Sequence, residues 1–311
     1  MKHKIILDCD PGHDDAVALL LAAHHPSLEL LAVTTVAGNQ SVDKTTKNAL
    51  KVCSLANLRH IPVARGMDRP LLRPAQHAPD IHGESGMDGP LIPEPDIEPV
   101  ASHAVDLLIE LLMNSDGDIT LVPTGPLTNI AAAMRQQPAI IPKIKAISLM
   151  GGSIGVGNTT PAAEFNIHTD PEAAAIVFGC GCPITVSPLE VTHQALATEE
   201  IVGRLRAANR RVATFVADLL VFFADTYRRV FGFSAPPLHD PCAVAAVIDP
   251  TILKGRMMRV EIETTGTWTA GRTVCDVYNV WRKEPNARVG YGLEVERFWD
   301  MLIETILTYE D

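Results

Sequence analysis

ILDCDPGHDDAVALLL, residues 6–21, runs from one apolar stretch through a cluster of aspartates into another apolar stretch. The first stretch is typical of a buried strand, and the Pro-Gly pair between the acids introduces a helix. Asp8 and Asp10 thus lie at the end of a strand, and Asp14 and Asp15 lie in the first helical turn. Two unit charges about 4 Å apart repel by roughly 4 kcal/mol at an effective dielectric near 20. A helix N-terminus stabilises each acid by at most about 1 kcal/mol, which is less than this repulsion. The stretch therefore predicts a bound cation.

The chemistry of the acids indicates which kind of ion they bind. Carboxylate oxygens without a cluster of thiolates or imidazoles favour a hard cation, so calcium or magnesium is expected rather than zinc. An EF-hand loop is excluded because, with Asp8 at its first position, the required glycine falls one place early at Gly12 and Leu19 takes the twelfth position. The alternative is that the acids only cap a helix, and their position at the end of a strand argues against it.

The first part of the chain alternates short β-branched runs with amphipathic helical stretches, a pattern typical of βαβ units. We expect an α/β, Rossmann-like fold with a mostly parallel central sheet and helices on both faces, because continuously apolar strands are covered on both sides. The predicted strands are 4–9, 28–36, 118–124, 144–150 and 182–188. The predicted helices follow residue 12 and lie near 41–57, 101–114, 126–135 and 171–178. The composition shows no linker, so residues 1–311 are predicted to form a single domain.

The rest of the chain has less regular patterns. Residues 66–99 form a long proline-rich segment without periodicity, which is typical of a functional loop or flap. Residues from about 198 to 231 are predicted to be helical, with β-like runs near 257–264 and 287–290 and a final helix at 294–309.

Polar or glycine-rich loops follow several predicted strands, at 8–15, 37–39, 124–129 and 150–158. In open α/β sheets, ligands bind outside the carboxyl ends of the strands. We therefore expect these four loops to converge on one site.

Composition excludes several classes of protein. The 311 residues are 47% hydrophobic, and 26 Lys and Arg against 37 Asp and Glu give a net charge of −11, which argues against a nucleic-acid partner. The six cysteines are scattered without a C-x-x-C pair and are expected to be reduced. We find no signal peptide pattern and no apolar run of the roughly 20 residues that a membrane helix needs. A soluble cytoplasmic protein without a membrane partner is expected.

Further candidate residues lie outside the acidic stretch. PLHDPCAVAAV places His239 and Asp240 at the start of a predicted helix, which alone is weak evidence of function. AAEFNIHTDPEAA offers Glu164 and Asn166. The glycines of GGSIGVGN fit neither G-x-G-x-x-G nor a G-K-[ST] loop, which favours close approach of the backbone to a small ligand. IHGESGMDGP contains His82 and is not a nucleophile elbow, since it lacks the second glycine.

Five separated blocks together resemble the inosine-uridine-preferring nucleoside hydrolases, and most closely the bacterial pyrimidine-preferring ribonucleoside hydrolases. The blocks are DCDPGHDDAVAL, TTVAGNQ, PTGPLTNIA, MGGSIGVGNTTPAAEFNIHTDPEAA and HDPCAVA. They follow the order and spacing of that family, and the resemblance weakens after the last block. It implies hydrolysis of the N-glycosidic bond of ribonucleosides, with a small-molecule ribonucleoside as substrate and a homotetrameric assembly.

The resemblance also implies roles for individual residues. Asp10, Asp15, Asp240 and the main-chain carbonyl of Thr124 match the ligands of a calcium ion, Ca²⁺, and Asp10 is implied as the general base for a calcium-bound water. Asp8 matches the first acid of the motif and is expected to have a supporting role. The positions that match those holding the ribose hydroxyls are Asp14, Asn39, Asn158, Glu164 and Asn166.

His239 matches the histidine that assists the leaving base, and His82 matches a second one found in pyrimidine-preferring members. Such a site suits the chemistry, because carboxylates stabilise an oxocarbenium-like sugar and an imidazole can protonate a departing base near neutral pH. Purine-specific relatives stack tryptophans on the base, whereas Trp268, Trp281 and Trp299 all lie late in this chain. We therefore expect uridine and cytidine to be preferred over inosine.

Three alternatives remain open at this point. A purine or broad-specificity nucleoside hydrolase would share the same motifs. A haloacid-dehalogenase-like phosphatase also has D-x-D after its first strand, but Gly12 stands where that family has Thr or Val. A calcium-dependent ribose or nucleoside binding protein would need neither Asp10 nor His239.

Overall fold

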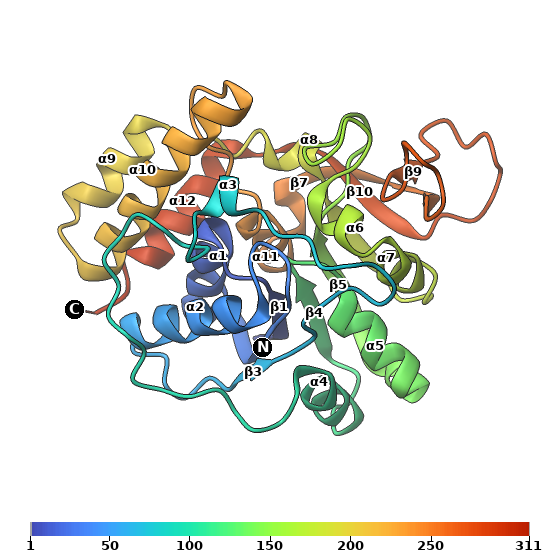
Figure 1. Ribbon diagram of the computed structural model, residues 1–311, viewed down its shortest axis with the longest axis horizontal. Coiled ribbons are helices and arrows are strands. Elements are labelled where there is room, and N and C mark those ends of the chain that lie inside the picture. Colours follow the sequence, from blue (N-terminus) through green and yellow to red (C-terminus); the bar gives the residue numbers. More distant parts are fainter. Residues whose placement is uncertain (1, 311) are drawn as a thin grey trace.

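The computed structural model describes residues 2–310, which form a central sheet with helices on both faces (Figure 1). The eight strands of this sheet lie in the order β3-β2-β1-β4-β5-β6-β10-β7. All neighbouring strands are parallel except β7, which runs antiparallel to β10 at one edge. The strands are β1 (His3–Cys9), β2 (Leu28–Thr35), β3 (Val63–Arg65), β4 (Ile119–Pro123), β5 (Ile144–Met150), β6 (Ile184–Ser187), β7 (Leu253–Met258) and β10 (Ala287–Leu293).

Helices cover each face of the sheet and enclose a separate apolar core. One face carries α1 (His13–His24), α2 (Val42–Leu55), α9 (Glu199–Ala207), α10 (Arg211–Phe231), α11 (Pro241–Ile248) and α12 (Val295–Ile306). The other face carries α4 (Ala104–Met113), α5 (Thr128–Gln136) and α7 (Pro171–Phe178). The predicted α/β fold with a mostly parallel sheet is therefore confirmed.

The centre of the sheet explains the apolar sequence before the acids. Ile5, Ile6 and Leu7 of β1 are fully buried, because β1 lies between β2 and β4 and is covered on both faces. The chain adds strands on one side of β1 first and then on the other, so the strand order reverses between β1 and β4. Such a reversal leaves a crevice at the carboxyl ends of the strands.

The predicted strands and helices of the first part are confirmed, with boundaries that move by a few residues. The helical prediction for 198–231 is also confirmed, although Asn209, with φ of 49°, separates α9 from α10. The strand β3 was missed because it has only three residues and directly follows a proline. The segment 66–99 contains a single short helix, α3 (Pro79–His82).

Shorter elements complete the described chain. They are α6 (Phe165–Thr169), α8 (Leu189–Thr192), the 3₁₀ helices η1 (Pro138–Lys143) and η2 (Pro250–Ile252), and the hairpin strands β8 (Val260–Ile262) and β9 (Thr273–Cys275). The chain around β9 projects from the body of the molecule (Figure 1). Trp268 in this region is 85% exposed.

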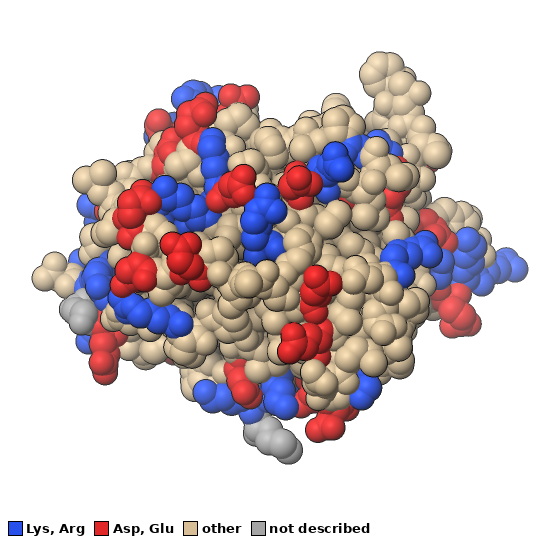
Figure 2. Space-filling model, turned by 60° about the horizontal axis from the view of Figure 1, so that its bottom comes forward, with Lys and Arg blue, Asp and Glu red and all other residues tan. Residues whose placement is uncertain are grey.

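The surface does not carry one dominant charge on the face that Figure 2 shows, where Lys and Arg alternate with Asp and Glu. Within residues 2–310, no helix is long and apolar enough to cross a membrane. All six cysteines are free thiols, and four of them are buried.

Candidate active site

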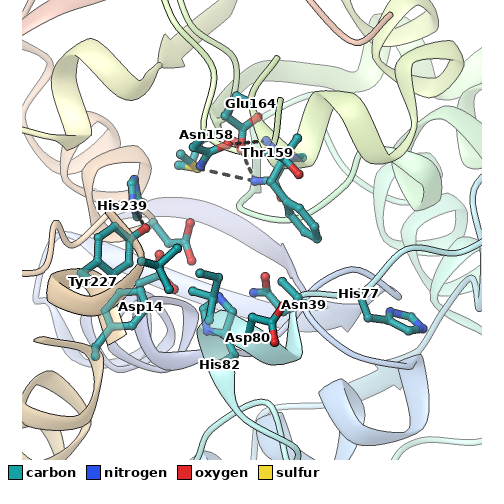
Figure 3. Close-up of a pocket in the computed structure, with 18 of the residues that line it drawn as sticks. Asp14, Asn39, His77, Asp80, His82, Asn158, Thr159, Glu164, Tyr227 and His239 are labelled. Atoms are coloured by element: carbon teal, nitrogen blue, oxygen red, sulfur yellow. Dashed lines mark hydrogen bonds between the residues drawn. The ribbon is translucent and has the colours of Figure 1, made fainter. Parts of the chain in front are cut away.

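A cavity of about 320 Å³ lies at the carboxyl ends of the central strands (Figure 3). Asp14 reaches it from the segment after β1, Asn39 from the loop after β2, Thr124 from the loop after β4, and Asn158 from the loop after β5. The predicted convergence of the four loops is thus confirmed. The volume lies within the range of pockets that enclose small molecules.

Most of the predicted site residues line this cavity. They are Asp14, Asn39, His82, Thr124, Asn158, Glu164, Asn166, His239 and Asp240. Asp10 and Asp15 are 1% and 0% exposed and lie behind the wall of the cavity. Asp8 is fully buried, and its Oδ1 accepts hydrogen bonds from Thr34 and Asn129 at 2.6 and 2.7 Å, which fits a supporting position outside the cavity.

Three carboxylates meet at the inner end of the cavity. One oxygen each of Asp14, Asp15 and Asp240 lies within 4.8 Å of the others. Asp15 is held at the N-terminus of α1, because its Oδ2 accepts the Gly12 N–H at 3.0 Å and its Oδ1 accepts the Thr124 hydroxyl at 2.9 Å. A cation placed between these three buried acids could therefore contact one oxygen of each of them.

Asp10 adjoins this cluster through Asn39. Its Oδ2 accepts the main-chain N–H of Asn39 at 2.6 Å, and the Asn39 amide donates to the Asp10 carbonyl at 3.1 Å and to Asp15 Oδ2 at 3.2 Å. A Cβ atom at Gly38 would collide with the Asp10 carboxylate, so only glycine allows this approach. The resemblance implies Asp10 as a metal ligand. The three acids whose oxygens lie close together are Asp14, Asp15 and Asp240, and Asp10 lies next to this group.

The electrostatics of the acids fit a cation. Burial and then the charge of Asp15 raise the pKa of Asp14 to about 8, and the same two causes raise the pKa of Asp10 well above its usual value. Burial, followed by the charges of Asp14 and Asp15, raises the pKa of Asp240. Burial and the neighbouring charges therefore disfavour the charged form of these carboxylates, and a divalent cation among these hard oxygen donors would offset both causes.

Another part of the cavity wall is held in place by hydrogen bonds to main-chain groups. Glu164 caps α6 and accepts the N–H groups of Gly152, Asn166 and Ile167 at 2.8, 2.9 and 3.2 Å. The Asn166 amide donates to the Thr124 carbonyl at 2.7 Å, which leaves the second lone pair of that oxygen available for another partner. These side chains are thus fixed before any ligand binds.

His239 is held from two sides. Its Nδ1 lies 2.7 Å from the Thr192 hydroxyl, and its Nε2 lies 2.7 Å from the Tyr227 hydroxyl. Burial lowers the pKa of His239 to about 3, so the ring is neutral in the free protein. Figure 3 shows Tyr227 and His239 side by side, close to Asp14.

Several lining residues were not predicted. They are Gln76, His77, Ala78, Asp80, Ile81, Met150, Thr159, Phe165, Phe223, Tyr227, Val230 and Phe231. Those of α10 carry no signal in the sequence, because aromatic residues on the apolar face of an amphipathic helix are typical of a core. Those of 76–81 belong to the proline-rich segment, which forms one wall of the cavity as its composition suggested.

The tryptophans contribute nothing to this wall within the described residues. Trp299 is buried against Phe298 in α12, and Trp268 and Trp281 are exposed in the region of β8 and β9.

Comparison with known proteins gives consistent matches. Residues 5–300 match the model of the inosine-uridine preferring nucleoside hydrolase family. The chain is 50% identical over 310 residues to the pyrimidine-specific ribonucleoside hydrolase RihA of Shewanella sp. (strain MR-7), covering 99% of this chain and 98% of that protein. It is 45% identical over 308 residues to RihB of Escherichia coli O139:H28, also named a pyrimidine-specific ribonucleoside hydrolase, with 99% and 98% coverage.

A solved structure gives the same result for the fold. The purine-preferring ribonucleoside hydrolase from Gardnerella vaginalis superposes with a TM-score of 0.92 at 33% identity, covering 98% of each chain. The motifs, the fold and these matches agree over nearly the whole sequence, and the chain belongs to the inosine-uridine preferring nucleoside hydrolase family.

Proposed function

We propose that this nucleoside hydrolase prefers the pyrimidine ribonucleosides uridine and cytidine and that it works with a bound calcium ion. The observation that carries the proposal is one cavity in which a buried carboxylate cluster faces two imidazoles, those of His82 and His239. The names of the relatives at 50% and 45% identity support the pyrimidine preference.

The calcium site would use Asp10, Asp15, Asp240 and the carbonyl of Thr124, with Asp14 beside them. A hard ion with six to eight oxygen ligands suits this set, which contains no thiolate or imidazole. When bound, the ion would orient the vicinal hydroxyls of ribose and acidify a water molecule.

The surrounding polar residues are assigned to the sugar. Asp14, Asn39, Asn158, Glu164 and Asn166 are proposed to bind the ribose hydroxyls. The side chains of Asn39, Glu164 and Asn166 are held by the hydrogen bonds described above. Asp10 takes the proton of the attacking water as general base. The carboxylates also stabilise the positive charge that develops on the sugar as the glycosidic bond breaks.

The departing base needs a hydrogen bond or a proton, and two groups are placed to help. His239 acts with Tyr227, whose hydroxyl lies in the cavity wall. His82, the last residue of α3, also lines the cavity. The Tyr227 hydroxyl and His82 are proposed to contact the base, because both ring nitrogens of His239 already have partners.

The test is a panel of uridine, cytidine, inosine and adenosine with calcium present, followed by release of free ribose and ranked by kcat/KM. We expect the two pyrimidine nucleosides to be the best substrates. A better rate with inosine would reverse the preference, and tight binding of uridine without ribose release would favour the nucleoside-binding alternative.

One observation favours a broader substrate range. Phe165, Phe223, Tyr227 and Phe231 all line the cavity and offer aromatic surfaces to a larger base. The purine-preferring relative from Gardnerella vaginalis shares the fold. The same panel decides between the two preferences.

On the basis of the resemblance we also propose that residues 1–311 form a single domain, that the protein assembles as a homotetramer, and that it is located in the cytoplasm. Sedimentation equilibrium with calcium present measures the assembly directly, and a monomer would contradict the tetramer.

A further inference from the structure

The hairpin of β8 and β9 makes contacts with the walls of the cavity that the assigned roles do not use. Residues 263–272 join its two strands, in the part of the chain that projects from the body of the molecule (Figure 1). Trp268 in this loop is mostly exposed, whereas Thr273, the first residue of β9, is 3% exposed. The base of the hairpin is therefore buried against the rest of the chain, while its tip stays in solvent.

Thr273 forms two hydrogen bonds with one residue of the loop that follows β5. Its hydroxyl accepts the main-chain N–H of Ser153 at 2.8 Å and donates to the main-chain carbonyl of the same residue at 2.6 Å. A hydroxyl can donate and accept at once, so one side chain satisfies both main-chain groups of Ser153. These bonds join positions 120 residues apart in the sequence.

The preceding residue, Gly152, shows how closely the hairpin approaches this loop. Gly152 has φ of 75°, a conformation that side chains other than glycine rarely adopt. A Cβ atom there would lie 2.7 Å from Cγ2 of Thr273. Glycine is therefore required at this position, both for the turn of the loop and for the contact with β9.

The bonds at Ser153 lie next to the main-chain group that holds Glu164. The N–H of Gly152 donates to Oε2 of Glu164 at 2.8 Å, and Glu164 lines the cavity. Because Gly152 and Ser153 are consecutive, the place of the Gly152 N–H depends on where Thr273 fixes Ser153.

A second contact of the hairpin reaches the same carboxylate through α6. Nδ1 of His168 lies 3.0 Å from the carbonyl oxygen of Ala270, which can only accept, so this nitrogen carries a hydrogen and donates it. A Cβ atom at Gly271 would lie 2.5 Å from the Cα of His168, so the backbone of the hairpin packs directly on α6. Glu164 caps this helix. The hairpin thus contacts both segments that hold the Glu164 carboxylate.

We propose that Thr273 is a positioning residue for the ribose site, which fixes Gly152 and Ser153 so that the Glu164 carboxylate is held in place to bind a ribose hydroxyl. The proposal rests on the proposed function, in which Glu164 binds the sugar. Thr273 bonds to the loop and does not line the cavity, so it acts through Glu164. The hairpin is thereby part of the machinery for sugar binding.

Substitutions of Thr273 separate its hydroxyl from its shape. Thr273→Val keeps the size of the side chain and the methyl group against Gly152, but it leaves both main-chain groups of Ser153 without a partner. Thr273→Ser keeps the hydroxyl and loses only the methyl group. Thr273→Cys offers a thiol, a weak hydrogen-bonding group, and provides a milder variant should Thr273→Val fold poorly. Thr267→Val, at an exposed position of the same hairpin, is the matched control.

The first measurement is kcat/KM for uridine, with calcium present, in a double-mutant cycle with Glu164→Ala. We expect Thr273→Val to lower kcat/KM about tenfold, because a displaced carboxylate no longer pairs with the sugar. Thr273→Ser and Thr267→Val should behave like the wild type, and Thr273→Cys should give a smaller loss than Thr273→Val. In the Glu164→Ala protein, Thr273→Val should cost less than about twofold, since no carboxylate is left to position.

The second measurement identifies the hydroxyl concerned, with 2'-, 3'- and 5'-deoxyuridine as competitive inhibitors of uridine hydrolysis. One of the three lacks the hydroxyl that Glu164 binds, and its Ki should be nearly the same in Thr273→Val and in the wild type. The Ki values of the other two should rise about tenfold. A general disturbance of the cavity would raise all three values alike.

Equal losses from Thr273→Val in the wild-type and Glu164→Ala proteins, or an equal rise in all three Ki values, would show a packing role alone and overturn the proposal. Unchanged kcat/KM in Glu164→Ala itself would instead remove the sugar contact that the proposed function assigns to Glu164, and this inference with it.

Discussion

The hydroxyl of Tyr227 lies 2.7 Å from Nε2 of His239, while Thr192 occupies the other nitrogen of the same ring. His239 therefore has no free nitrogen directed at a substrate, and the Tyr227 hydroxyl is the group of this pair that can pass a proton to a base. We expect Tyr227→Phe to lower kcat for uridine roughly 100-fold, within the range of a lost general acid.

Ribosides with a good leaving group provide the control for Tyr227→Phe. The phenolate of p-nitrophenyl riboside leaves without a proton, so the substitution should change its rate little. Equal losses on both substrates would show that Tyr227 shapes the cavity and takes no part in proton transfer.

Asp10→Asn should abolish turnover. The amide keeps the size of the side chain but cannot take a proton from water, so kcat for uridine should fall by about 10³-fold or more. The matched control is Asp8→Asn, because the Asp8 carboxylate is held by Thr34 and Asn129 and not by the residues of the acid cluster. Ribose release is measured on both variants, and near-normal turnover in Asp10→Asn would contradict the role of general base.

The proposed calcium site predicts that removal of the metal abolishes activity and lowers stability together. An ion that binds only the folded state stabilises it by about 2.7 kcal/mol at a concentration 100 times its Kd. We therefore expect treatment with a chelator to lower Tm and to stop ribose release, and added Ca²⁺ to restore both. An unchanged Tm and rate after exhaustive chelation would exclude a required metal.

The proposed ribose contacts predict discrimination against 2'-deoxyuridine. Without the 2'-hydroxyl, buried groups such as Asn39 and Glu164 lose a partner, and sites built to bind a hydroxyl reject the analogue by roughly 10⁴-fold. The ratio of kcat/KM for uridine and 2'-deoxyuridine measures this effect. Comparable values would show that the assigned residues do not bind the sugar hydroxyls.

Asp170 should be important for stability rather than for chemistry. Its carboxylate accepts hydrogen bonds from the Thr128 hydroxyl at 2.7 Å, the Leu71 N–H at 2.9 Å and the Ala173 N–H at 3.0 Å, so it joins the proline-rich segment to α5 and α7. We expect Asp170→Ala to lower the free energy of unfolding by about 3 kcal/mol, since buried donors are left unpaired. Urea unfolding measures the change, and Asp68→Ala, an exposed acid of the same segment, serves as control.

Periodicity was sufficient to predict most of the fold. Strands such as β1 and β4 have apolar, buried centres, and helices such as α2 repeat apolar residues with the helical period, so local pattern and tertiary burial agree. The strand β3 and the helix α3 were not predicted, because each is too short to show a period of apolar residues. Their positions depend on contacts with distant residues.

The candidate site was predictable where acids or amides stand at strand ends, as for Asp14 and Asn39. The pairing of Tyr227 with His239 was not, because it joins one face of a long apolar helix to a loop that precedes another helix. The contact of His13 with His82 spans 69 positions in the sequence, and nothing in either local stretch indicates it.

The strand order has a consequence for how the chain reaches this structure. The strand β6 is complete by residue 187, but its outer neighbour β10 begins only at Ala287. Because about 100 residues separate the two strands, we expect β6 to stay an open edge with unpaired main-chain groups until this distant segment docks. Refolding from denaturant should be slow, and aggregation should increase with protein concentration during that interval.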